Sequence, residues 1–575
     1  MLVLANGEKG VVCAVHLPHE EAVMRRSVVV VLAVLAILGL LAPPSFAQAP
    51  APKVTISGLV DFVTTAYKNW SQVGNQPSSV TAGSQPDVTN SKEKGWYSRE
   101  RGLFTLTGEV GKVKGVWAIE LDFTNGGGNF NASSQPGSLT TVGVAQSGTS
   151  ANFDLDTDVQ GAVETKWLYV EAPITGPGSL LPFIPVASIG RFGGQPFRGH
   201  NYKVGILASG DFPGATLETT WAPNVRSTLT FVQISEALDK FIAPNQKDSF
   251  AFLASLEMDV FKGLTIKPTY AYAHYDGGNC GTANLGTPAW GGYNPNANCP
   301  AVTAGNVAAP GGVGRDIKRH YLGADVRWTM GPITVQPTFI YLLGEQEILN
   351  RNGVINDVDI RSFIADTIVG FRTGPLNIEA RVMYTPGQNA NHDSQNAGGG
   401  TIRRYDPINS GFAYMNGWTE IWTGDIDYIT SFYAGRSSLV MRESPSYDKY
   451  GRIFGGLAAD YSLTPALTFR ALTNVSWTDT SVDTKGILAN GITTSTFAFH
   501  GGKERYLGNE WILGLTYRFA PNVTFDLAAA ALITGDALNI QRTGGDGNNP
   551  CVTDGVSTCQ SRNVYKGTAR IRVTF

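Results

Sequence analysis

Residues 565–575 alternate strictly between two kinds of side chain. The odd positions carry Tyr, Gly, Ala, Ile, Val and a terminal Phe, while the even positions carry Lys, Thr, Arg, Arg and Thr. A period of two predicts a strand with one apolar and one polar face. A strand of about 9–11 residues with its apolar face outward can cross a bilayer as part of a tilted, closed barrel. The end of the chain therefore predicts a membrane-spanning strand.

The same alternation recurs along the chain, for example in residues 54–62, 117–123, 250–260 and 376–384. Charge confined to one face of many such segments is typical of a transmembrane β-barrel. We predict an all-β fold, an antiparallel barrel of sixteen to eighteen strands, with eighteen favoured. The eighteen ranges are 53–67, 96–110, 114–123, 162–172, 186–192, 212–222, 225–236, 249–261, 264–276, 316–330, 333–348, 358–373, 376–386, 450–463, 467–479, 509–520, 523–535 and 564–575.

The predicted connections are of two kinds, and the two kinds alternate along most of the chain. Short ones are turn sequences such as Lys262-Gly263, Gly331-Pro332 and Gly374-Pro375. Long ones, such as 277–315 and 388–449, are rich in Gly, Asn, Ser and Thr. This pattern predicts periplasmic turns and long external loops. Within 388–449, residues 417–422 could form a further strand, a short helix or a folded loop, which keeps sixteen strands possible.

The first residues predict export. Met24-Arg25-Arg26 precedes an apolar run from Ser27 to Ala42, and small residues follow up to Ala47. This pattern is typical of a secretory signal peptide, which we place at 24–47, with an N-terminal membrane anchor as the alternative. We expect residues 1–23 to reflect an upstream start codon and 48–575 to form the barrel. No apolar run of about 18 residues follows, so no transmembrane helix is predicted.

Composition agrees with a barrel and argues against other classes. Charged residues are 16% of the chain, aromatic residues are 10%, and there are 67 glycines. The mean hydropathy of -0.06 is what outward apolar and inward polar residues average to. The net charge of -3 provides no basic surface for nucleic acid.

Cysteine and histidine positions predict disulfides and no catalytic site. Cys280 and Cys299 lie in one long loop, and Cys551 and Cys559 lie in another. In an exported protein this spacing favours two loop-closing disulfides. The seven His residues show neither a Ser-His-Asp order nor a metal-ligand spacing. We therefore expect neither an enzyme, a metal nor a cofactor.

Three segments resemble Gram-negative outer-membrane porins, general or substrate-specific. Residues 54–62 look like the porin start, 189–203 resemble the third external loop, and the terminal Phe575 resembles the porin ending. The ending implies recognition by the barrel-insertion machinery, and the family implies possible homotrimers. The loop implies a pore constriction formed by the side chains of Arg191, Arg198, His200, Lys203 and Asp211. The alternative is that these are ordinary solvated loop charges. The family's acidic cluster is not evident in this loop.

The alternation also predicts which charges line the lumen, because Arg or Lys facing hydrocarbon costs about 2–4 kcal/mol at the midplane. The candidates that we single out are Arg327, Arg381, Arg470, Arg518, Arg570 and Arg572. A barrel of this size keeps an aqueous interior. We therefore expect an outer-membrane channel for passive diffusion of small hydrophilic solutes. A substrate-specific channel for anions or sugars, or a structural or adhesive surface barrel, are the alternatives.

Overall fold

The computed structural model describes eighteen stretches of the chain, and the structural statements below concern these residues. They are 51–69, 94–125, 158–159, 163–197, 199–235, 249–276, 316–349, 355–388, 401–408, 414–415, 417–422, 445–446, 450–482, 487–488, 504–538, 540–543, 557–559 and 562–575. The barrel lies within Pro52–Phe575, one of two compact units of the chain. The predicted leader, 1–47, lies outside the described residues.

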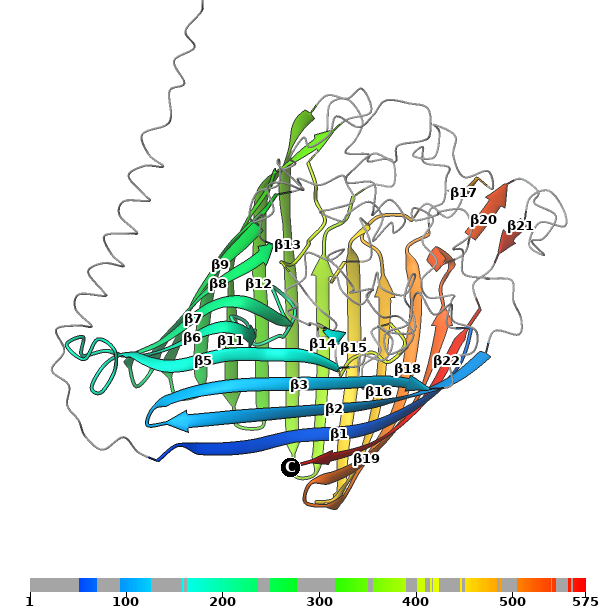
Figure 1. The fold of residues 1–575 in the computed structure, drawn as a ribbon. Coiled ribbons are helices and arrows are strands. Elements are labelled where there is room, and N and C mark those ends of the chain that lie inside the picture. The colour runs from blue at the N-terminus through cyan, green and yellow to red at the C-terminus, as the bar shows by residue number, and fades with distance from the viewer. Residues whose placement is uncertain are drawn as a thin grey trace, which may run out of the picture. The chain divides into compact units, whose positions relative to one another are not determined.

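Within the described part of the chain, eighteen long strands pair antiparallel in chain order and close into a barrel (Figure 1). They are β1 (Lys53–Lys68), β2 (Lys94–Val110), β3 (Val113–Asn125), β5 (Val163–Thr175), β6 (Ala187–Pro196), β7 (Asp211–Ala222), β8 (Val225–Ser235), β9 (Ser249–Phe261), β10 (Leu264–Asp276), β11 (Asp316–Met330), β12 (Ile333–Leu349), β13 (Ile355–Thr373), β14 (Leu376–Thr385), β15 (Arg452–Thr464), β16 (Leu467–Trp477), β18 (Tyr506–Ala520), β19 (Val523–Thr534) and β22 (Val564–Thr574). The first and last strands pair from Leu59 opposite Thr574 to Lys68 opposite Tyr565. The predicted fold class and strand number are confirmed.

Four shorter strands and one helical turn complete the described secondary structure. The two-residue β4 (Asp158–Val159) pairs with β5. A separate small sheet contains β17 (Ile487–Leu488), β20 (Ile540–Thr543) and β21 (Ser557–Cys559), and η4 (Asp536–Leu538) is a single 3-10 turn.

The alternation of the sequence becomes an apolar outer wall. On β22, Tyr565, Ile571 and Val573 are 40–47% exposed, while Lys566 and Thr568 are buried inside. A soluble protein would cover such a ring of exposed apolar side chains, whereas a bilayer requires it. Glu100 departs from the rule, because it lies opposite Phe62 on the outward side of the wall.

Aromatic side chains mark two levels on the outer wall. Phe363 and Phe371 on β13, and Trp477 and Phe469 on β16, are each eight residues apart. Eight residues span about 26 Å along a strand, or about 20 Å across the membrane at a tilt near 40°. Aromatic girdles at this spacing are typical of the two interfaces of a membrane barrel.

Two-residue turns lie at the end of the barrel where the C-terminus also lies (Figure 1). Gly331 and Gly374 open two of these turns with φ of 58° and 55°, which only glycine adopts without strain, and each is followed by proline. The strand ends that the long connections join lie at the opposite end, whereas the eleven-residue β5–β6 connection, 176–186, lies at the turn end.

Candidate functional site

The β6–β7 connection, Phe197–Gly210, runs into the barrel. The Phe197 amide donates to the Gly210 carbonyl at 2.8 Å, which holds the two ends of the connection together at the wall. Beyond this neck, the His200 ring lies 2.9 Å from the Thr230 hydroxyl of β8 and 3.0 Å from the Ser255 hydroxyl of β9. Both hydroxyls are on inward faces, so the connection follows the inside of the wall.

Two further side chains anchor this connection to more distant strands. Asn201 Nδ2 donates to Asp325 Oδ2 of β11 at 2.7 Å. Lys203 Nζ donates to the Thr338 hydroxyl of β12 at 2.7 Å and to the Asp366 carbonyl of β13 at 3.1 Å. The wall residues in these contacts lie five to seven residues from the turn ends of their strands. The connection therefore lies against the inner wall near the middle of the membrane band.

Burial removes the charge of His200 and shields that of Lys203. His200 is fully buried, and burial together with the positive charge of Lys267 lowers its pKa to about 3. Burial also lowers the pKa of Lys203, although Asp366 and Asp325 act in the opposite direction. Since Lys203 is only 7% exposed, both side chains fix the position of the connection and do not face open water.

The described parts of the β14–β15 connection, which spans 386–451, form a second segment inside the barrel. Arg470 of β16 donates to the Gly417 carbonyl at 2.5 Å. Glu510 of β18 accepts hydrogen bonds from the Glu420 and Ile421 amides at 2.8 and 2.7 Å. The described parts of this connection reach wall strands that the β6–β7 connection does not contact. The two segments meet at β13, where Asp366 contacts both Lys203 and Tyr414.

The two connections also contact each other. The Tyr405 hydroxyl donates to the Ile206 carbonyl at 2.9 Å, and the Ile408 amide donates to the Leu207 carbonyl at 2.8 Å. Their buried apolar side chains belong to the hydrophobic core: Ile206, Leu207, Tyr405, Ile408, Tyr414, Met415, Trp418, Ile421 and Trp422. Residues 417–422 are thus an inward-folded loop and form neither strand nor helix. Two tryptophans in a polar connection were the signal for this burial, because large apolar side chains in a loop need a core.

The other predicted constriction residues lie at the wall or outside the described residues. Arg191 of β6 forms an ion pair with Glu171 of β5 at 2.6 Å. Asp211, the first residue of β7, lies 3.4 Å from Lys166 Nζ. Arg198 lies outside the described residues.

Of the predicted wall arginines, Arg381 and Arg470 position the β14–β15 connection. Arg381 NH2 donates to Asp366 Oδ2 at 2.6 Å and also contacts the Tyr414 carbonyl at 3.4 Å. Arg381 is 2% exposed, so its charge interacts with Asp366 and the Tyr414 carbonyl in the packed interior and does not face the water of the lumen.

The remaining four differ in exposure. Arg570 pairs with Asp526 at 2.8 Å, and Arg572 pairs with Asp61 across the closing seam. Arg327 and Arg518 are exposed. The Arg327 guanidinium stacks over the Tyr202 ring at 4.1 Å, which places it beside the inserted β6–β7 connection.

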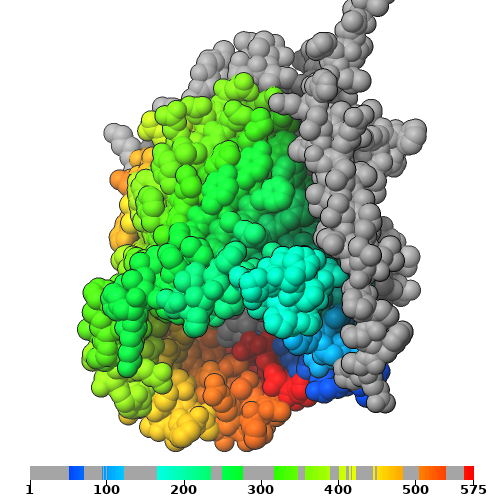
Figure 2. Space-filling model, turned by 90° about the vertical axis from the view of Figure 1, so that its left-hand side faces the viewer, coloured from blue at the N-terminus to red at the C-terminus, as the bar shows by residue number. Residues whose placement is uncertain are grey.

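Charges of both signs remain accessible on the inner wall near the turn end. Arg226 pairs with Glu257 at 2.7 Å, with 58% and 22% of the side chains exposed. Arg470 and Asp460 are 35% and 27% exposed. Figure 2 shows a hollow in the lower part of the molecule, bounded by green, yellow, orange, red, blue and cyan segments in turn. The turn end therefore contains a polar vestibule.

Other predicted features are only partly described. Cys280, Cys299 and Cys551 lie outside the described residues, and Cys559 ends β21 opposite Ile540. The two disulfides stay a prediction. The described residues contain no cluster of three or more His, Cys, Asp or Glu that could hold a metal. Among the same residues, no helix has the length and apolar character needed to span a membrane.

Comparisons with known proteins found similar solved structures only. No family model and no curated protein matches the chain. The chain is similar to Pseudomonas aeruginosa OccK8 (OprE), with 10% identity, 91% of this chain and 98% of that chain covered, and a TM-score of 0.42. It is also similar to Acinetobacter baumannii OccAB1, with 9% identity, 91% and 97% covered, and a TM-score of 0.42. Pseudomonas aeruginosa OccK5 (OpdH) has 10% identity, 91% and 98% covered, and a TM-score of 0.41. The fold assignment rests on the closed strand pairing described above.

Proposed function

We propose that this protein is a Gram-negative outer-membrane channel through which small hydrophilic solutes and ions diffuse passively. The observation that carries the proposal is a closed barrel of eighteen described strands that is apolar outside and charged inside. A barrel of 16–18 strands encloses a space too wide for its own wall side chains to fill. No cofactor is needed for diffusion.

The β6–β7 and β14–β15 connections form the constriction of the channel. They are anchored near mid-height by Lys203 and Arg381, so the narrow part lies within the membrane band. Solute size is limited by the space that the two connections leave, and ion preference by the accessible wall charges. The predicted constriction thus involves a second segment besides the one that follows Arg191.

The direct test is single-channel recording with the purified, folded barrel in a planar bilayer. We expect discrete conductance steps that scale with the salt concentration. Deleting residues 199–205 removes the anchors of the β6–β7 connection and should raise the step size. A heat-modifiable, folded barrel without any conductance would overturn the proposal and favour a plugged surface or adhesive barrel.

A substrate-specific anion channel is the second candidate. Lys267 and Arg327 lie 5.3 and 4.1 Å from the centre of the Tyr202 ring, which places two cations at the inserted connection. A reversal potential that favours chloride, together with block by one class of anion, would select this candidate over general diffusion.

Assembly follows from the closing strand. Phe575 pairs with Gly58 through both backbone groups, at 2.9 and 3.0 Å. We propose that the barrel-insertion machinery recognises this aromatic end. The homotrimer stays a prediction of the family resemblance.

A further inference from the structure

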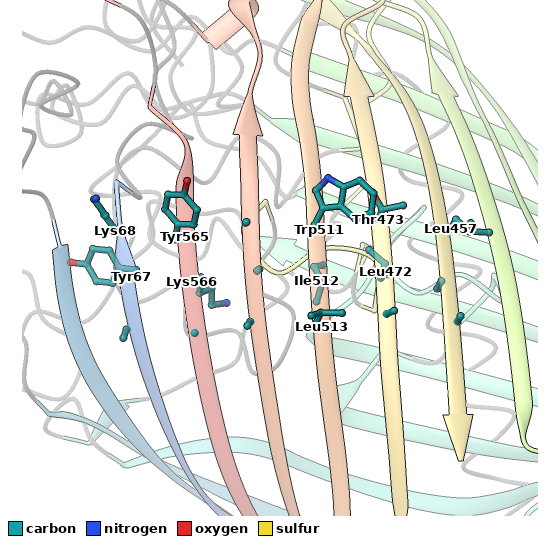
Figure 3. Close-up of a pocket in the computed structure, with 18 residues that line it drawn as sticks. Tyr67, Lys68, Leu457, Leu472, Thr473, Trp511, Ile512, Leu513, Tyr565 and Lys566 are labelled. Atoms are coloured by element: carbon teal, nitrogen blue, oxygen red, sulfur yellow. The ribbon is translucent and has the colours of Figure 1, made fainter. Parts of the chain in front are cut away.

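The outer wall is hollowed on the side where the barrel closes. A cavity of about 840 Å³ opens there across β15, β16, β18, β19, β22 and β1. Its size lies within the range of about 300–1,000 Å³ that is usual for small-molecule sites. Figure 3 shows Trp511 and Tyr565 projecting on either side of β19, which carries no large side chain at this point.

Strand register explains the shape of this groove. One row across the strands contains Lys68, Tyr565, Ala531, Trp511, Thr473 and Leu457. The row nearer the turns contains Ala66, Gly567, Ala529, Leu513, Ala471 and Ala459. Alanine and glycine thus form the floor, and the exposed side chains of Tyr565, Trp511 and Leu513 form the walls.

The groove lies on the lipid side of the wall. Trp511, Leu513 and Tyr565 are 56, 67 and 47% exposed, whereas Ile512 and Lys566, which alternate with them, are buried inside. Hydrocarbon tails gain little from burial against other apolar surface, so affinity must come from shape and from the head group. A chain that fills the groove restores the van der Waals contacts that a gap forfeits.

Two lysines lie at the loop end of the groove. Lys68, which lines it, is directly opposite Lys94 on β2, and both side chains are exposed on the outward face. Like charges directly opposite each other are unfavourable in a sheet unless an anion lies between them. A phosphate at the membrane surface supplies that anion, since basic side chains there bind anionic head groups.

We propose that the groove binds one lipid of the outer leaflet, with an acyl chain along Ala66, Gly567 and Ala529 and a head-group phosphate at Lys68 and Lys94. The leaflet follows from the position of both lysines at the end of the barrel with the long connections. The inference rests on the membrane location that the proposed function assigns. It does not depend on the barrel being open.

The test is native mass spectrometry of the purified barrel with dilauroyl phosphatidic acid and, separately, dilauroyl phosphatidylcholine. We expect the wild type to retain one phosphatidic acid. The Ala529→Leu/Gly567→Leu variant, which fills the floor, should lose this adduct, while Ala380→Leu on the outward face of β14 should keep it. Lys68→Gln and Lys94→Gln should each weaken retention about fivefold, whereas Lys318→Gln should not.

Conductance and heat-modifiability of each variant are measured in parallel. If the Ala529→Leu/Gly567→Leu variant retained as much phosphatidic acid as the wild type, the inference would be overturned. If Lys68→Gln and Lys94→Gln both left the retention of phosphatidic acid unchanged, the phosphate site would be excluded. Equal retention of phosphatidylcholine and phosphatidic acid by the wild type would also exclude it. Conversion of an oligomer to monomers by Ala529→Leu/Gly567→Leu would show that a second copy occupies the groove. A wild type that binds the lipid but does not conduct would refute the channel and leave the lipid site standing.

Discussion

Lys566 on the closing strand lies 2.9 Å from the Glu420 carboxylate in the β14–β15 connection, and it also donates to the Glu420 carbonyl at 3.0 Å. Both side chains are almost completely buried, at 5% and 4% exposure. The strand that closes the barrel therefore also holds one of the two segments that narrow it. Breaking a buried ion pair by removing one partner costs about 3–5 kcal/mol, which is enough to release a loop.

The Lys566→Met variant should consequently show larger and noisier conductance steps than the wild type. The barrel itself should remain folded, because its strand ladder does not involve this side chain. The charge-swapped variant Glu420→Lys/Lys566→Glu is the control, and it should bring the conductance back toward the wild-type value. A Lys566→Met channel identical to the wild type would remove the anchoring role from this pair.

Acid should loosen the β6–β7 connection through His200. Its pKa is about 3 when the connection is packed and about 6.5 when the ring is in water, so only the released form binds a proton between these values. The packed form is therefore fully stable above about pH 6.5 and loses about 1.4 kcal/mol per pH unit below it. Single-channel conductance should rise between pH 6.5 and 4. The His200→Gln variant should lack this rise, and an unchanged pH profile would contradict the assignment.

Lys203 and Arg327 should have separable effects on the channel. Lys203 is bound by wall oxygens, so Lys203→Met should cost about 1–3 kcal/mol of loop anchoring and raise conductance. Arg327 is exposed beside the connection, so Arg327→Glu should shift the reversal potential in a salt gradient toward cations. A stronger selectivity change from Lys203→Met than from Arg327→Glu would reverse these roles.

Removing Phe575 should lower the yield of folded barrel. Its backbone pairs with Gly58 of β1 and its ring lies 5.9 Å from that of Phe104 of β2, so the deletion loses contacts with two strands at the start of the chain. A side chain at Gly58 would meet the Leu103 carbonyl and the Phe575 ring. Gly58→Val should therefore resemble the deletion, whereas Val60→Ala should assemble normally. The measurement is the heat-modifiable fraction in isolated outer membranes.

The sequence alone predicted the order and approximate limits of the strands and favoured eighteen of them, while the structure decided between sixteen and eighteen. The reason is that a bilayer imposes a local rule, apolar outside and polar inside, which each strand such as 564–575 satisfies on its own. Turn sequences such as Gly331-Pro332 then set where each strand ends. Arg570 and Arg572 alternate with apolar residues along this strand, so the same rule predicted that both side chains point inward.

Only the tertiary structure decided what the inward residues do. Alternation cannot tell that Arg381 is buried against Asp366 while Arg518 stays exposed, because the difference depends on segments distant in the sequence. Nor can it tell that His200 and Lys203 anchor a loop, since their partners Thr230 and Thr338 come from other strands. The lipid-side groove likewise needs the register of six strands, because single alanines and glycines form one hollow only when hydrogen bonding aligns them side by side.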